Sequence, residues 1–217
     1  MSSVAAIGHS AEGIISDESM IWTPSKSHSA YSISKFHSEM EVWRGIEEGL
    51  QAVIVNPSVI IGPGNWDKSS TALFSSIYKG LKFYPSGSTG FVDVRDVAKA
   101  MLMLMESDIS GERFILNASE MKYKDVFQII ASSLNKSAPN IAVKRSLAEI
   151  GWRTEWLKSF ILRTNPQITR ETVASGFNNS AFSNKKIVEK LDFKFIPVEQ
   201  SIRDTGALLL KNLEYKE

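Results

Sequence analysis

The chain has 217 residues, of which 43% are hydrophobic and 23% are charged. This size and composition predict a globular protein of one or two domains with a substantial core. A net charge of +1, with no apolar run near ~20 residues and no signal-peptide pattern, argues against nucleic-acid or membrane partners and favours a cytoplasmic location. The absence of cysteine excludes disulfides, and the three histidines lack metal-ligand spacing, so we predict no metal site.

Short apolar runs alternate with helical patterns from the first residues, which predicts an α/β fold. The first expected strand, Ser2–Ile7, precedes a polar loop over Gly8–His28 and a helix over Ala30–Glu48. A second strand begins near Gln51 and runs into the turn-forming segment Gly62-Pro63-Gly64. Loops of this kind often build binding sites.

Further alternation follows in the second half of the chain. The sequence predicts a strand over Phe91–Asp93 and a helix over Val97–Met105 with Asp96 as its N-terminal cap. Asp93 and Asp96 could form a catalytic carboxylate pair, but a helix cap with Arg95 as ion-pair partner is the preferred interpretation. The other expected elements are a helix over 70–79, a strand over 112–117, and helices over 123–134, 147–162, 169–175, 184–191 and 200–210.

Tyr31 and Lys35 carry the clearest chemical signal in the sequence. Residues four apart on a helix project from the same face, which brings the ammonium close to the phenol. A phenol titrates near ~10, so it transfers protons near neutrality only where a neighbouring cation favours the phenolate. Ser3, expected at a strand end, could hydrogen-bond the same substrate oxygen. The alternative interpretation of Tyr31 and Lys35 is an ordinary surface pair on a helix.

Several further segments occur in a fixed order around this pair: Ser3, Tyr31, Lys35, Asn56-Pro57-Ser58, Ile61-Gly62-Pro63 and Phe91–Ala98. In this respect the chain resembles the extended short-chain dehydrogenase/reductase superfamily, specifically its NAD-dependent epimerase/dehydratase group and the dihydroflavonol-reductase-like branch. The resemblance covers essentially the whole chain. It implies the C-terminal part of a Rossmann-type doubly wound parallel sheet, together with a smaller α/β substrate domain.

The resemblance also implies a division of the chain and a cofactor. Residues 1–61 would form the C-terminal portion of the NAD(P)-binding domain. Residues 62–217 would form mainly the substrate-binding domain, with 90–105 returning to the main sheet. NAD or NADP would be the cofactor, and a small-molecule carbonyl or alcohol would be the substrate.

By the same resemblance, each candidate residue has an expected role. Tyr31 would act as the proton donor, and Lys35 would support its phenolate. Tyr31 and Lys35 would both bind the nicotinamide ribose. Ser3 would orient the substrate oxygen and share its developing charge. Pro57, Ser58 and Val59 would flank the nicotinamide ring.

The family's Gly-rich phosphate-binding turn does not occur in this sequence. We therefore expect a fragment or truncated product of a longer enzyme, or a half that pairs with a separate N-terminal half. In either case the isolated chain should bind NAD or NADP poorly. The residues that would select between the two cofactors are missing as well.

Two positions narrow the expected reaction. Val4 and Ala5 follow Ser3, where family dehydratases carry acidic residues, so dehydration is disfavoured. Thr89 stands where enzymes for nucleotide sugars tend to carry an arginine. A carbonyl reductase or alcohol dehydrogenase for a small or apolar substrate is favoured. The alternatives are an NAD-dependent sugar epimerase and a non-catalytic substrate-domain module.

The 30–48 helix also carries a candidate dimer surface. Phe36, Met40 and Trp43 form an apolar stripe at helical spacing. A homodimer through this helix is one interpretation, and packing of the stripe within its own chain is the other.

Overall fold

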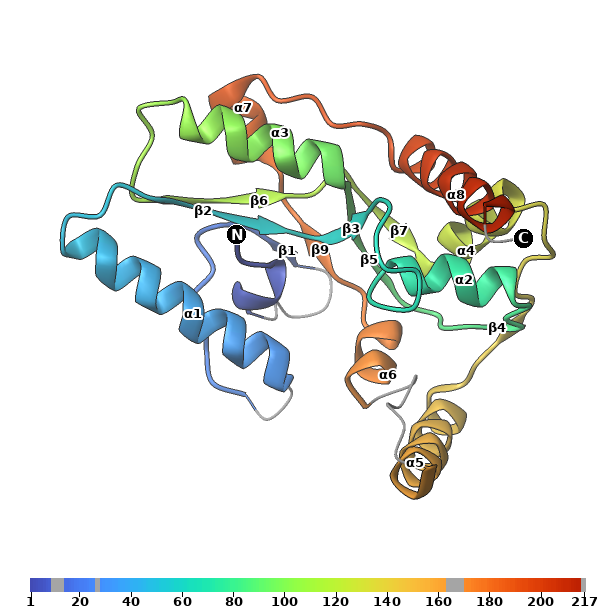
Figure 1. Ribbon diagram of the computed structural model, residues 1–217. Coiled ribbons are helices and arrows are strands. Elements are labelled where there is room, and N and C mark those ends of the chain that lie inside the picture. Colours follow the sequence, from blue (N-terminus) through green and yellow to red (C-terminus); the bar gives the residue numbers. More distant parts are fainter. Residues whose placement is uncertain (9–13, 26–27, 163–169, 216–217) are drawn as a thin grey trace.

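Strands and helices alternate along the chain in the computed structural model, which describes residues 1–8, 14–25, 28–162 and 170–215, with side chains outside 155–172 (Figure 1). The first half contains the 3₁₀ helix η1 (Val4–Ala6), β1 (Ile15–Ser16), α1 (Ala30–Glu47), β2 (Val53–Pro57), β3 (Val59–Ile61), α2 (Thr71–Tyr78), β4 (Phe83–Tyr84), β5 (Ser88–Asp93) and α3 (Val94–Met105). The second half contains β6 (Glu112–Leu116), β7 (Ser119–Lys122), α4 (Tyr123–Ser133), β8 (Ile141–Ala142), α5 (Arg145–Leu162), α6 (Arg170–Phe177), β9 (Ala181–Phe182), α7 (Lys185–Leu191) and α8 (Val198–Glu214).

The central strands change neighbours at Ser58. Before this residue, β2 pairs in parallel with β6, and after it β3 pairs in parallel with β5, which in turn pairs antiparallel with β7. The Ser58 amide donates to the Leu116 carbonyl (3.0 Å), so the break occurs where β6 ends. The segment from Gln51, predicted as one strand, is therefore two strands with different partners.

Helices cover both sides of the β2–β6 pair. In Figure 1, α1 lies on one side of these strands, and α3 and α7 lie on the other. Parallel strands with helices on both faces are the arrangement of a doubly wound α/β sheet. The predicted fold class is confirmed. The strand β6 (Glu112–Leu116), from the second half of the chain, pairs with β2 in this sheet.

The expected strand over Ser2–Ile7 is wrong. The Ser2 amide donates to the Val55 carbonyl of β2 (2.8 Å), and the chain then turns into η1 instead of continuing as a strand. Ser3 is the N-cap of this turn, and its hydroxyl oxygen accepts a hydrogen bond from the Ala5 amide (3.2 Å). A short apolar run fits a buried turn as well as a strand, and a serine cap favours the turn.

Two apolar clusters fill the interior, and adjacent residues of β5 contribute to them separately. Phe91 belongs to the cluster enclosed by α2, α4 and α8, whereas Val92 belongs to the cluster between the strands and α3 and α7. Successive side chains of a strand point to opposite faces, which explains this division. We call these the α4–α8 cluster and the α3–α7 cluster.

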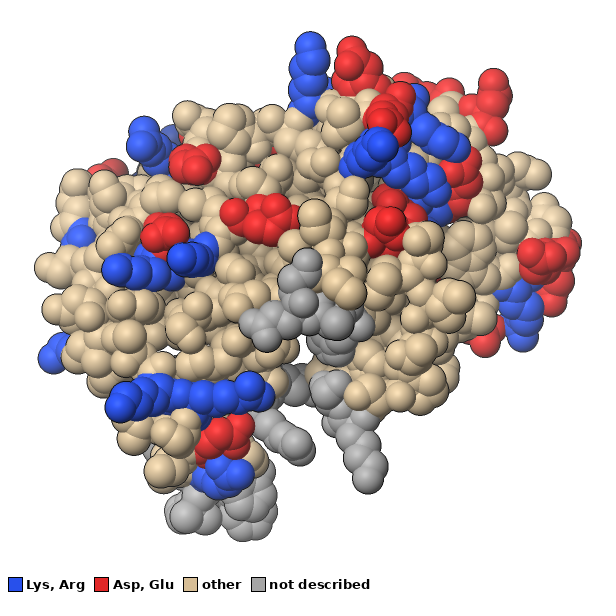
Figure 2. Space-filling model, turned by 180° about the vertical axis from the view of Figure 1, so that it is seen from behind, with Lys and Arg blue, Asp and Glu red and all other residues tan. Residues whose placement is uncertain are grey.

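Charged side chains lie mainly on the surface, with both signs mixed. On the face shown in Figure 2, the acidic and basic side chains of the described residues are interspersed. None of the helices in the described ranges is long and apolar enough to cross a membrane.

Candidate active site

Tyr31 and Lys35 project from the first two turns of α1. The helix begins after Ser29, whose hydroxyl oxygen accepts a hydrogen bond from the Ser32 amide (3.0 Å) and caps the helix. The Lys35 ammonium lies 5.8 Å from the centre of the Tyr31 ring. Tyr31 is 52% exposed, and Lys35 is partly buried. Within the described part of the chain, Lys35 makes no ion pair, and its recorded contact is the one with the Tyr31 ring.

Ser3 lies where η1, α1 and β2 meet. The Ser3 carbonyl accepts a hydrogen bond from the Asn56 side-chain amide (3.0 Å) near the carboxyl end of β2. The turn η1 that follows Ser3 packs against both α1 and β2. The structure therefore brings Ser3 close to the Pro57–Val59 segment, because Asn56 immediately precedes Pro57.

Pro57, Ser58 and Val59 form the junction between β2 and β3. Pro57 and Ser58 are buried, and Val59 is partly buried. The Ser58 hydroxyl donates to the Leu116 carbonyl (3.2 Å) and so helps to hold the junction against β6. Their proposed contact with a nicotinamide ring stays a prediction.

Three polar residues to which the sequence analysis assigned no role are also central to this region: Glu39, Asn56 and Arg113. Glu39 and Asn56 are buried, and Arg113 donates to Glu39 (3.2 Å). A signal for Glu39 was available, because it follows Tyr31 and Lys35 at successive four-residue steps on the same helix. No comparable spacing points to Arg113, which comes from a distant strand.

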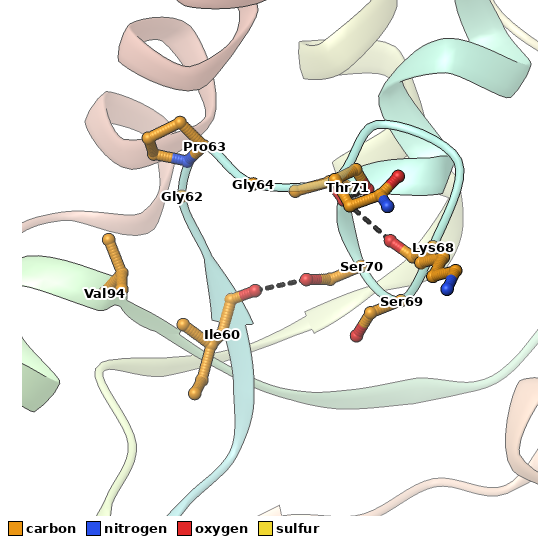
Figure 3. Close-up of a pocket in the computed structure, with 10 residues that line it drawn as sticks. Ile60, Gly62, Pro63, Gly64, Lys68, Ser69, Ser70, Thr71 and Val94 are labelled. Carbon is orange, nitrogen blue, oxygen red and sulfur yellow. Dashed lines mark hydrogen bonds between the residues drawn. The ribbon is translucent and has the colours of Figure 1, made fainter.

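The loop after β3 borders a pocket of about 190 Å³, lined by Gly62, Pro63 and the residues before α2. Figure 3 shows the Ser70 hydroxyl turned toward the Ile60 carbonyl (2.5 Å) and Thr71 bonded to the Lys68 carbonyl (2.7 Å). Both hydroxyls are therefore used to fold the loop. Lys68 is the charged residue among those that line the pocket.

The apolar stripe on α1 is largely used inside the chain. The Phe36 ring stacks on Trp22 from the preceding loop, with centroids 4.6 Å apart. Trp43 is partly buried, and its indole nitrogen lies 3.4 Å from the Glu39 carboxylate. Met40 is 46% exposed. Met40 is therefore the most exposed of the three residues, while Phe36 and Trp43 are partly buried, and dimerisation through α1 stays a prediction.

Asp93, and not Asp96, caps α3. Asp93 accepts a hydrogen bond from the Arg95 amide (2.7 Å) and pairs with its guanidinium. Burial raises the pKa of Asp93, but the hydrogen bonds from Arg95 and Ser201, together with the charge of Arg95, outweigh burial and leave that pKa below its ordinary value. Asp96 lies buried in the first turn and accepts from the Ile196 amide (2.8 Å). Burial raises the pKa of Asp96. Each carboxylate thus has a structural partner.

Comparison with known proteins gives related reductases. The putative dihydroflavonol 4-reductase of Synechocystis sp. is 28% identical over 212 residues, which cover 94% of this chain and 61% of that protein. Tetraketide alpha-pyrone reductase 2 of Arabidopsis thaliana is 35% identical over 104 residues, which cover 46% of this chain and 32% of that protein. The chain thus spans less than two thirds of these relatives.

Solved structures share the fold. The crystal structure of gox2253 has a TM-score of 0.76 at 27% identity, with 97% of this chain and 65% of that chain covered. A nucleoside-diphosphate-sugar epimerase from Pseudomonas aeruginosa has a TM-score of 0.78 at 19% identity, with the same coverage. Residues 1–117, more than half of the chain, match the NAD dependent epimerase/dehydratase family. The chain therefore belongs to this family.

Proposed function

We propose that the chain provides the proton-transfer and substrate side of an NAD(P)-dependent carbonyl reductase or alcohol dehydrogenase. The observation that carries the proposal is the Tyr31–Lys35 pair, with the ammonium 5.8 Å from the ring centre. Tyr31 gives its proton to a substrate carbonyl oxygen, and the neighbouring cation stabilises the phenolate that remains. In the oxidative direction, the phenolate accepts the alcohol proton.

Ser3 is the second group for the same oxygen. Its oxygen already accepts from the Ala5 amide (3.2 Å), and its own hydrogen can still be donated to a substrate. A donor fixed by η1 and Asn56 stabilises negative charge as it develops on the substrate oxygen.

The residues of this region fit the nicotinamide end of the cofactor. Tyr31 is half exposed and Lys35 has no competing acid among the described residues, so both can hold the nicotinamide ribose. Pro57, Ser58 and Val59 would flank the ring. NAD or NADP, when bound, supplies or accepts the hydride. A structural neighbour, Gre2 from Candida albicans, is described in complex with NADPH.

Reduction of a small carbonyl has more support than sugar epimerisation. The Synechocystis and Arabidopsis relatives are both named as reductases. Thr89, whose place in nucleotide-sugar enzymes tends to hold an arginine, lies in β5 opposite Met121 and brings no cation to the strand. Val4 and Ala5 in η1 supply no acid or base for dehydration.

Replacement of Tyr31 tests the proposal. In the complete gene product, Tyr31→Phe should slow NADPH-dependent carbonyl reduction by ~10² or more, with a much smaller change in cofactor affinity, because Lys35 still holds the ribose. Tyr78→Phe is the matched control, because Tyr78 also contacts a lysine, Lys136, with 4.5 Å between ammonium and ring centre. Near-normal turnover by Tyr31→Phe would contradict the proposal.

A further inference from the structure

A buried carboxylate connects α1 to the segment that carries Ser3. Glu39 is 4% exposed, and its Oε2 atom accepts hydrogen bonds from the Asn56 amide nitrogen and from the Ser2 hydroxyl, each at 2.8 Å. Asn56 lies in β2 and bonds to the Ser3 carbonyl, and Ser2 directly precedes Ser3 in the sequence. Glu39 thus binds residues 2–6, which we call the Ser3 segment, and it does so from the same helix that carries Tyr31.

Asn56 transmits this contact to the serine backbone. Its side-chain nitrogen donates to Glu39 and also to the Ser3 carbonyl (3.0 Å). Both partners are acceptors, so only the NH₂ end of the amide can face them, and the orientation of Asn56 is fixed. Asn56 is fully buried, which removes water as a competitor for these bonds.

Arg113 makes burial of the carboxylate possible. Its guanidinium donates to Glu39 Oε1 (3.2 Å) and also to the carbonyls of Glu18 (2.8 Å) and Met20 (2.6 Å). A buried carboxylate requires a cation and several donors, and Arg113, Asn56 and Ser2 meet that requirement. The carbonyl contacts in turn hold Arg113, so the Glu39 side chain has a single defined position.

We propose that Glu39 is a positioning residue that sets the place of Ser3 relative to Tyr31 and Lys35. This rests on the proposed function, in which the Ser3 hydroxyl binds the substrate oxygen. One rigid helix carries the proton donor, the cation and the anchor of the serine segment. Displacement of a positioned group by ~1 Å can cost ~10²-fold in rate, so such an anchor has a direct catalytic consequence.

The competing interpretation is that Glu39 and Arg113 form only a structural ion pair. The two interpretations differ at Asn56, because Asn56→Leu removes both amide bonds but leaves the Glu39–Arg113 pair in place. Trp43→Phe is the control, since it removes a 3.4 Å contact to the same carboxylate without touching the Ser3 segment.

Amide hydrogen exchange, measured by NMR on the 217-residue chain without cofactor, tests the anchor directly. In Asn56→Leu and Glu39→Met, the Ala5 and Ala6 amides should exchange at least ~10-fold faster. Asn56→Leu removes the donor to the Ser3 carbonyl, and Glu39→Met removes the carboxylate that holds the Ser2 hydroxyl and Asn56. Trp43→Phe should leave both rates within ~2-fold. If Glu39→Met does not fold, Asn56→Leu decides alone. Unchanged exchange in Asn56→Leu, or equal acceleration throughout β6, overturns the proposal.

Turnover by the complete gene product tests the consequence. Asn56→Leu should lower kcat by ~10-fold, and in a Ser3→Ala background it should cause no further loss beyond ~2-fold, because both changes act through Ser3. A full additional loss in that background contradicts positioning through Ser3. If Ser3→Ala alone keeps normal turnover, the proposed role of Ser3 fails, whereas the exchange experiment still decides whether Glu39 holds it.

Discussion

The two ends of the strand layer are stabilised by different chemistry. Around β3 and β5, the α4–α8 cluster is apolar, and Phe74, Phe91 and Ile130 in it are fully buried. In α1, the buried side chains are the polar Ser32 and Glu39, and a set of polar contacts converges on Glu39. Apolar burial is non-directional and depends on volume, whereas a buried polar group needs each of its partners. The first region should respond to lost volume, and the second to the loss of single atoms.

The largest effect on stability is expected in the α4–α8 cluster. Phe91→Ala should destabilise the chain by ~3–5 kcal/mol, because it removes a fully buried ring and leaves a cavity. Phe83→Ala, at an exposed ring in β4, should cost less than ~0.5 kcal/mol. Urea unfolding measures both. Similar costs for the two variants would mean that the cluster does not dominate this end of the molecule.

At the polar end, loss of one charge should be nearly as costly. Arg113→Met keeps the aliphatic bulk but leaves the Glu39 carboxylate buried without its cation, and we expect a loss of ~3 kcal/mol. The control is Arg153→Met, which breaks an exposed ion pair with Glu149 and should cost less than ~0.5 kcal/mol. If Arg113→Met is as mild as its control in urea unfolding, the polar network is not needed for stability.

Close packing of α4 against α8 can be tested at a glycine. A methyl group at Gly206 would lie 2.8 Å from Ser133 Cβ, so Gly206→Ala should destabilise by ~1–3 kcal/mol through overpacking. At Gly151 in α5, a methyl group meets nothing within 4 Å, and Gly151→Ala should stabilise by ~1 kcal/mol through helix propensity. Opposite signs in the denaturation midpoints are the expected result. Stabilisation by both would show that the α4–α8 contact is loose.

The smallest effect is expected at Asp96, which joins α3 to the segment before α8 through the Ile196 amide. Because burial raises the folded-state pKa of Asp96 above its unfolded value, its ionisation lowers stability as the pH rises between these two values. Asp96→Asn keeps an acceptor for Ile196 and should raise the melting temperature at pH 7. The gain should disappear as the pH falls below ~4.

The control for this pH dependence is exposed Asp108, where Asp108→Asn should leave the melting temperature unchanged at both pH values. A gain from Asp96→Asn that is equal at pH 7 and at low pH would show that the effect does not come from the charge of Asp96.

Local pattern was sufficient for much of the fold and for one pair of the site. Helical spacing predicted α1 and the common face of Tyr31 and Lys35, and apolar runs predicted β2 and β6. The prediction failed where one local pattern fits two structures. Ser2–Ile7 has strand-like composition but forms a capped turn, and the capping role expected of Asp96 belongs to Asp93.

By itself, the sequence determined the alternation of strands and helices and the four-residue spacing of Tyr31 and Lys35. Both depend on near neighbours along the chain, because hydrogen bonding and side-chain direction are set within one helix or strand. Only the tertiary structure decided that Asn56 and Arg113 both bond to Glu39 and that Asn56 also bonds to the Ser3 carbonyl. Glu39 comes from α1, Asn56 from β2 and Arg113 from β6. Asn56 is 17 positions from Glu39 in the sequence, and Arg113 is 74 positions from it. No local periodicity links them, since their contact arises only when α1 packs against the strands.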